Sequence, residues 1–146
     1  MNWIIVSAVA SWLLAQVIKT VVWHVRGNRF TWRVAVGTGG MPSSHTSFVC
    51  ATAFGCGVRC GMDSVAFALG VTLAAVVIYD AMGVRRESGR HAAVINRLVE
   101  SAGAGMQDQK PLETSLGHRP AEVICGGVLG IAVSAATFFW IAPRFI

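Results

Sequence analysis

Three stretches of about 20 apolar residues constrain this chain more than any other feature. They cover residues 3–25, 64–84 and 121–141, and a shorter apolar stretch covers residues 44–58. A helix of about 20 apolar residues crosses the hydrocarbon core of a bilayer and bonds its own backbone groups there. With 54% hydrophobic and 13% charged residues, the chain is also too apolar for an ordinary water-soluble domain. We therefore expect an all-α integral membrane bundle of about four transmembrane helices, forming one domain over residues 1–146.

Residues 85–100 have a different pattern, which predicts an amphipathic helix. One face carries apolar residues and another carries arginines spaced by four and seven: Val94, Ile95, Leu98 and Val99 on the first, and Arg86, Arg90 and Arg97 on the second. A helix of this kind usually lies in the headgroup layer of a membrane. We expect an interfacial helix here.

The basic residues give an orientation. Of the twelve Lys and Arg residues, ten fall in or beside the first and third connections, and only Arg59 and Arg144 lie on the other side. By the positive-inside rule, these connections are cytoplasmic and both termini are outside. The net charge of +5 therefore needs no nucleic-acid partner. We expect a multi-pass protein of the cell membrane, the inner membrane in a bacterium, and the cysteine spacing suggests no metal site.

A Gly-rich turn over residues 37–46 precedes the shorter apolar stretch. Its glycines permit a tight turn, and Pro42, Ser43 and Ser44 read as the start of a helix. A helix N-terminus facing such a turn suits an anion, most often phosphate. His45 lies in the first helical turn, where it could pass a proton to the bound group. From this stretch alone, an ordinary polar turn with an interfacial histidine explains the pattern equally well.

Two cations end the first apolar stretch. Lys19 and Arg26 are seven residues apart, nearly two helical turns, so both lie on one face. They could grip two oxygens of one phosphate, with Arg26 supplying a bidentate fork. Alternatively, the two cations only orient the helix in the membrane and extend their charged ends to the headgroup layer. This alternative accounts for Arg26 better than for the more deeply placed Lys19.

Two further clusters lie at the same end of the expected bundle. Asp80 would be costly in hydrocarbon without a partner, and Arg85 and Arg86 follow it closely. We expect Asp80 to pair with an arginine in a structural role. His118 and Glu122 are four residues apart at a helix start, so the carboxylate could accept a proton from the imidazole. The other ring nitrogen would then be available as a nucleophile.

Taken together, Lys-x6-Arg, Pro-Ser-x-His and His-x3-acid, in that order on a membrane protein, are similar to the type-2 phosphatidic acid phosphatase and vanadium haloperoxidase superfamily. The short length and three longer motifs resemble its divergent bacterial and plastid branch. Those motifs are Gly-Gly-Met-Pro-Ser-Ser-His, Asp-x-x-Gly-Val-Arg-Arg and Leu-Gly-His-x-Pro-x-Glu-Val. The resemblance covers nearly the whole chain, from about Lys19 to the last apolar stretch.

The resemblance implies a role for each cluster. Lys19 and Arg26 would bind phosphate, His45 would be the general acid, and His118, oriented by Glu122, would attack phosphorus to form a phosphohistidine. The superfamily's third-motif arginine falls at Leu112 here, so Arg85 or Arg86 would replace it, held by Asp80. Gly27 and Ser44 replace a proline and a glycine of the superfamily's motifs.

The function we expect is therefore a metal-independent phosphatase acting on a lipid or isoprenoid phosphate or diphosphate at the cytoplasmic leaflet. Ser43 and Ser44 would help to bind the phosphate, and vanadate could occupy the same groups as a phosphate mimic. One alternative is a non-catalytic protein that binds anionic headgroups or acts as an assembly factor. A lesser one is vanadate-dependent peroxidase chemistry. Membrane lipids are the expected partners, and a homo-oligomer is left open.

Overall fold

A computed structural model describes residues 1–25, 27, 40–101, 110–114 and 116–144. Within these residues the chain is helical and contains no strand. The helices are α1 (Trp3–Val25), α3 (Ser44–Cys60), α4 (Val65–Met82), α5 (Val84–Ser101) and α6 (Pro120–Ala136), and α6 continues through the π-helical turn η1 (Thr137–Ile141) into the 3-10 turn η2 (Ala142–Arg144). Three helical stretches are long and apolar enough to cross a membrane, namely Trp3–Val25, Val65–Ser101 and Pro120–Ile141. The expected all-α membrane bundle is confirmed.

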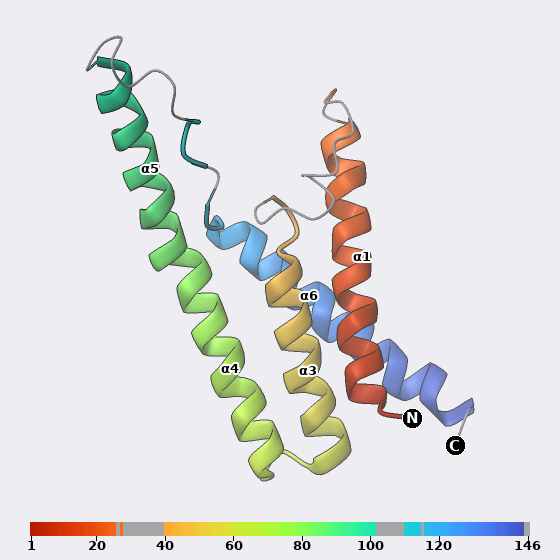
Figure 1. Cartoon of the computed structure of the whole chain (residues 1–146). Coiled ribbons are helices and arrows are strands. Elements are labelled where there is room, and N and C mark those ends of the chain that lie inside the picture. The colour runs from red at the N-terminus through yellow and green to blue at the C-terminus, as the bar shows by residue number, and fades with distance from the viewer. Residues whose placement is uncertain (26, 28–39, 102–109, 115, 145–146) are drawn as a thin grey trace.

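Helix α3 corresponds to the fourth expected span, and it is the centre of the bundle. It packs against α1, α4 and α6 (Figure 1). Its 17 residues measure about 25 Å, slightly less than the hydrocarbon thickness of about 30 Å. It is also less apolar than the three helices that qualify as spans, because small and hydroxyl residues fill its buried faces.

Small residues let the helices approach α3 closely. A Cβ atom added at Gly126 or Gly130 of α6 would lie 2.4 Å from the Ser43 carbonyl oxygen or 2.2 Å from that of Ser47. Hydroxyl groups join the same surfaces: Ser11 Oγ donates to the Ser47 carbonyl at 3.2 Å, and Ser134 Oγ donates to the Ala51 carbonyl at 3.1 Å. Close backbone approach and interhelical hydrogen bonds are the usual basis of helix packing in lipid.

The helix ends follow the sequence signals. Ser43 caps α3, and Ser64 Oγ caps α4 by accepting the Phe67 N–H at 3.1 Å. Gly61, with φ of 89°, turns the chain between these two helices. Pro120 stands in the first turn of α6, where its missing N–H costs no hydrogen bond.

Helix α5 is the expected amphipathic helix, but its course differs from the one expected. It continues the direction of α4 and does not turn across the end of the bundle (Figure 1). The reason is local: the Gly83 N–H donates to the Tyr79 carbonyl and the Glu87 N–H donates to the Gly83 carbonyl, so hydrogen bonding runs through the junction. The combined helix of 37 residues measures about 55 Å.

The packed face of α5 also differs from the apolar face expected. Val94, Ile95 and Leu98 are exposed, whereas Gly89 and Ala92 are buried. The C-terminal ends of α1 and α4 and the N-terminal ends of α3 and α6 all point toward this end of the molecule (Figure 1). The motifs found in the sequence lie at these four helix ends.

Candidate functional site

The N-terminus of α3 supplies the first part of the site. Ser43 Oγ accepts the Thr46 N–H at 3.4 Å and the Thr46 hydroxyl at 2.9 Å, so it is the helix cap. His45 is exposed in the first turn. The N–H groups of Ser44 and His45 have no acceptor within the helix, because the first amides of any α-helix lack one. The helix start that the sequence predicts is therefore present, and an anion site there stays a prediction.

The two serines that we expect to help bind the phosphate lie inside the bundle. Both are buried, with exposed fractions of 0% for Ser43 and 1% for Ser44. The Ser43 hydroxyl already accepts two hydrogen bonds, and the Ser43 N–H donates to the Glu122 carbonyl at 3.0 Å. Ser43 therefore joins α3 to α6.

Lys19 is buried in α1, with 5% of its surface exposed. The site of a Cβ atom on Gly40 is 3.4 Å from Lys19 Cγ, so the turn before α3 covers the stem of this lysine. Gly40 has a φ of 88°, which a residue with a side chain rarely adopts. Arg26, the second expected phosphate ligand, lies outside the described residues.

His118 is held in place by its backbone. Its N–H donates to the Ala81 carbonyl at the end of α4, at 3.0 Å. The preceding Gly117 has a φ of 88°, and a Cβ atom there would lie 2.5 Å from the backbone nitrogen of Arg86. The His118 side chain is 4% exposed, and neither Nδ1 nor Nε2 has a hydrogen-bond partner among the described residues. Burying an imidazole without hydrogen-bond partners costs free energy, which is explained if the ring contacts a ligand.

The expected hydrogen bond between Glu122 and His118 is not formed. Glu122 Oε2 accepts the Arg119 N–H at 3.1 Å, as part of a capping box at the start of α6. The spacing of four residues does not place the two side chains on one helical face, because His118 precedes the helix and Arg119 between them is extended. The negative charge of Glu122 instead interacts electrostatically with the His118 imidazole. It also interacts electrostatically with the Lys19 ammonium group.

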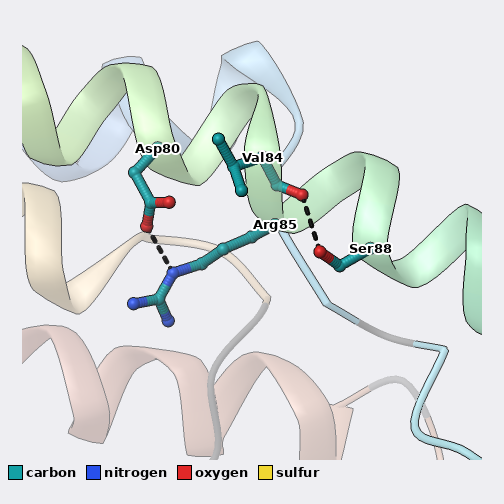
Figure 2. Close-up of polar contacts among 4 residues, drawn as sticks. All are labelled: Asp80, Val84, Arg85 and Ser88. Atoms are coloured by element: carbon teal, nitrogen blue, oxygen red, sulfur yellow. Dashed lines mark hydrogen bonds and ion pairs between the residues drawn. The ribbon is translucent and has the colours of Figure 1, made fainter.

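The expected pairing of Asp80 with an arginine is present. Arg85 Nε donates to Asp80 Oδ2 at 2.5 Å, across the junction of α4 and α5. Figure 2 shows that Asp80 engages the Nε side of the guanidinium, while the two terminal nitrogens point away from the carboxylate. The Ser88 hydroxyl in the same view donates to the Val84 carbonyl at 2.9 Å, which is an ordinary bond within α5.

The charges of several of these groups act on His118. His118 is within range of the charges of Lys19, His45, Arg85 and Glu122. Burial lowers the pKa of His118 below its usual 6.5, with Glu122 opposing the shift and Lys19, His45 and Arg85 reinforcing it. The imidazole is therefore neutral at neutral pH, as a nucleophile requires. Arg86 contributes its backbone to the packing of Gly117, whereas Arg85 carries the charge that acts on both histidines.

Sequence reasoning missed the contacts that hold the segment before His118. Asn96 of α5 donates from Nδ2 to the Leu112 carbonyl and accepts the Leu112 N–H at Oδ1, both at 2.9 Å. A Cβ atom on Gly89 would lie 2.8 Å from the Thr114 carbonyl oxygen. Gly89, Ala92, Ala93 and Asn96 recur at helical spacing, and this run of small residues was the available signal. In the part of the chain that the structure describes, no group of three His, Cys, Asp or Glu residues could hold a metal ion.

Comparisons with known proteins identify the family of this chain. The chain is 37% identical over 145 residues to the uncharacterized membrane protein YuiD of Bacillus subtilis (strain 168), covering 91% of this chain and 92% of the relative. No solved structure matches the chain significantly. A family profile described as "Divergent PAP2 family" matches residues 1–133. The matched region includes every cluster described above, and the chain belongs to the divergent PAP2 family.

Proposed function

We propose that this protein is a membrane phosphatase that hydrolyses a lipid phosphate or diphosphate through a phosphohistidine on His118. The observation that carries the proposal is the buried, neutral imidazole of His118. Neither of its ring nitrogens has a partner among the described residues, and it lies within electrostatic range of Lys19, His45 and Arg85. A nucleophile, an acid and two cations are the groups that phosphoryl transfer requires.

The reaction would proceed in two displacements. One nitrogen of His118 donates its lone pair to phosphorus, the bond to the leaving oxygen breaks, and protonated His45 gives that oxygen its proton. A water molecule then attacks phosphorus, neutral His45 takes a proton from it, and the phosphorus–nitrogen bond breaks to release phosphate. Lys19, Arg85 and the free amides of α3 would stabilise the charge on the equatorial oxygens. Arg26 would join them.

A lipid is favoured as the substrate because one face of α3 is open beside His45. The other faces are covered: Ser47 packs against α6 and α1, and Ala53 packs against Gly70 of α4. His45, Phe48 and Thr52 recur every three to four residues on the remaining face, where His45 and Phe48 are exposed. An apolar chain lying along Phe48 and Thr52 would bring its phosphate to His45.

The side of the membrane is inferred from charge. Ten of the twelve basic residues flank the connections that hold the site, so we place the site at the cytoplasmic leaflet. The basic face of α5 would attract anionic headgroups to the same side. Multi-pass insertion in the cell membrane follows from the same argument.

One observation favours a second candidate, a non-catalytic binder of anionic headgroups. Glu122 caps α6 and does not hold the His118 ring, so the orienting bond expected of a catalytic histidine is missing. A binder would need the cations and the α3 amides but no oriented imidazole. The ring of an unliganded enzyme can instead be oriented by the substrate, since catalytic hydrogen bonds often tighten only in the complex.

Phosphate release separates the two candidates. Purified protein in detergent is assayed with a panel of lipid phosphates and diphosphates, together with His118→Ala, and with vanadate binding measured on both. An enzyme releases phosphate from at least one lipid, and His118→Ala abolishes release while vanadate still binds. If the wild-type protein releases none and His118→Ala binds anionic lipid equally well, the binder takes the place of the phosphatase.

A further inference from the structure

The segment that leads to His118 is attached along α4 and α5 at four points. We refer to this segment, described at residues 110–114 and 116–118, as the strap. Asn96 bonds Leu112 twice, Gly89 lies against Thr114 and Leu116, Arg86 lies against Gly117, and the Ala81 carbonyl accepts the His118 N–H. Positions on the helices descend as positions on the strap rise, so the strap runs antiparallel to α4 and α5.

The strap is short relative to the length of helix that it follows. From Ala81 to Asn96 the helices rise about 22 Å, at 1.5 Å per residue. From Leu112 to His118 the chain has six residues, which can reach at most about 20–22 Å. The position of Leu112 on α5 therefore limits where His118 can lie. Gly89 and Arg86 contact the strap between these ends, so a shift at Leu112 is passed along a segment that is held throughout its described length.

Two residues of α5 fix this register. The Asn96 amide forms a paired donor and acceptor with the Leu112 backbone. Gly89 allows the carbonyl oxygens of Thr114 and Leu116 to approach within 2.8 Å and 2.9 Å of where a Cβ atom would be. Any larger residue at position 89 would push the strap away from the helix.

We propose that Asn96 and Gly89 are positioning residues that hold His118 at the phosphate site through the strap. The amphipathic helix α5 is then part of the reaction machinery and not only a membrane anchor. The inference rests on the proposed function to the extent that His118 is the reacting group. The placement of His118 can be measured without turnover, so the two claims fail separately.

The first measurement is the rate at which diethyl pyrocarbonate modifies each histidine, read by mass spectrometry of the full-length protein in detergent. His24, His45 and His91 are exposed and act as internal references, whereas His118 is buried. Loss of two exposed hydrogen bonds should raise the open fraction of the strap about tenfold. We therefore expect His118 to react about tenfold faster in Asn96→Ala, and faster also in Gly89→Ala, with the three references unchanged.

Two variants control for nonspecific effects. Val94→Ala changes an exposed position on the other side of α5 and should leave the His118 rate unchanged. Asn96→Gln keeps a donor and an acceptor and should restore part of the protection that Asn96→Ala loses. An unchanged His118 rate in both Asn96→Ala and Gly89→Ala would overturn the proposal. So would an equal rise at all four histidines, which would indicate general loosening of the fold.

The second measurement is the split between binding and turnover. Asn96→Ala should lower kcat for phosphate release about tenfold, because misplaced catalytic groups cost rate steeply. Its affinity for vanadate should remain within about twofold of wild type, since Lys19 and the α3 amides are untouched. If the wild type releases no phosphate, the phosphatase proposal fails while the modification rates still decide the role of Asn96 and Gly89. If wild type is active and Asn96→Ala keeps full kcat, the positioning role is refuted.

Discussion

Gly130 is the position where the packing of the bundle can be tested most sharply. Its missing side chain lets α6 lie directly on α3, because a Cβ atom there would be 2.2 Å from the Ser47 carbonyl oxygen and 2.9 Å from its carbon. In Gly130→Ala, the two helices must separate by about 1 Å to restore van der Waals contact. Overpacking of this kind costs about 1–3 kcal/mol. It would also stretch the bond between Ser11 and the Ser47 carbonyl.

Gly127 supplies a matched control in the same helix. A Cβ atom at Gly127 would lie 3.5 Å from Cys50 Sγ and 3.8 Å from Thr46 Cγ2, which are ordinary contacts. Gly127→Ala should therefore gain the helix propensity of alanine, up to about 1 kcal/mol. Because Gly130→Ala gains the same propensity, overpacking alone sets the difference between the two variants, about 1–3 kcal/mol.

The assay is the free energy of unfolding in mixed micelles, titrated with SDS and followed by far-UV circular dichroism. We expect Gly127→Ala to unfold at higher SDS than wild type and Gly130→Ala at lower SDS. Equal midpoints for the two variants would refute the close approach of α6 to α3, and with it the placement of His45 relative to His118.

Three further results are expected. His118→Ala should lose several orders of magnitude in phosphate release, whereas His45→Ala should lose about 10²–10⁴-fold and recover on substrates with better leaving groups; equal losses that no leaving group relieves would contradict these roles. On the acid side of the pH profile, kcat/KM should fall only below pH 6.5, because burial lowers the pKa of His118 and the neutral imidazole attacks. Glu122→Gln removes the charge that raises this pKa, so the fall in kcat/KM should move to still lower pH. In intact cells, an impermeant maleimide should label Cys60, which is exposed at the end of α3, and should not label Ser101→Cys in a Cys60→Ser background; the reverse pattern would place the site outside.

The apolar pattern was sufficient for the helices but not for their roles. The stretch over residues 44–58 reads as a short span, and its helix does begin at Ser44. That it is the centre of the bundle depends on Gly126 and Gly130, whose significance appears only when α6 is laid against it. Amphipathicity likewise located α5. It could not show that hydrogen bonding through Gly83 keeps α5 in line with α4.

The site was predictable where one residue type had one obvious partner. An unpaired Asp80 carboxylate would be costly in hydrocarbon, and Arg85 is close enough in sequence to form an ion pair with it. Glu122 was assigned to His118 because a spacing of four residues suggests one face of a helix. His118 lies before the start of α6, and the carboxylate caps that helix instead. Asn96 lies on an ordinary helical surface, and its two bonds to Leu112 could be found only from the fold.

The phosphohistidine itself is the most direct test of the account. Wild-type protein is mixed with a lipid phosphate carrying labelled phosphorus, quenched in base within the first turnovers, and digested for mass spectrometry. We expect an acid-labile, base-stable phosphoryl group on His118, present in His45→Ala at lower yield and absent from His118→Ala. Turnover without any label on His118, or label on another residue that persists in His118→Ala, would contradict the central claim.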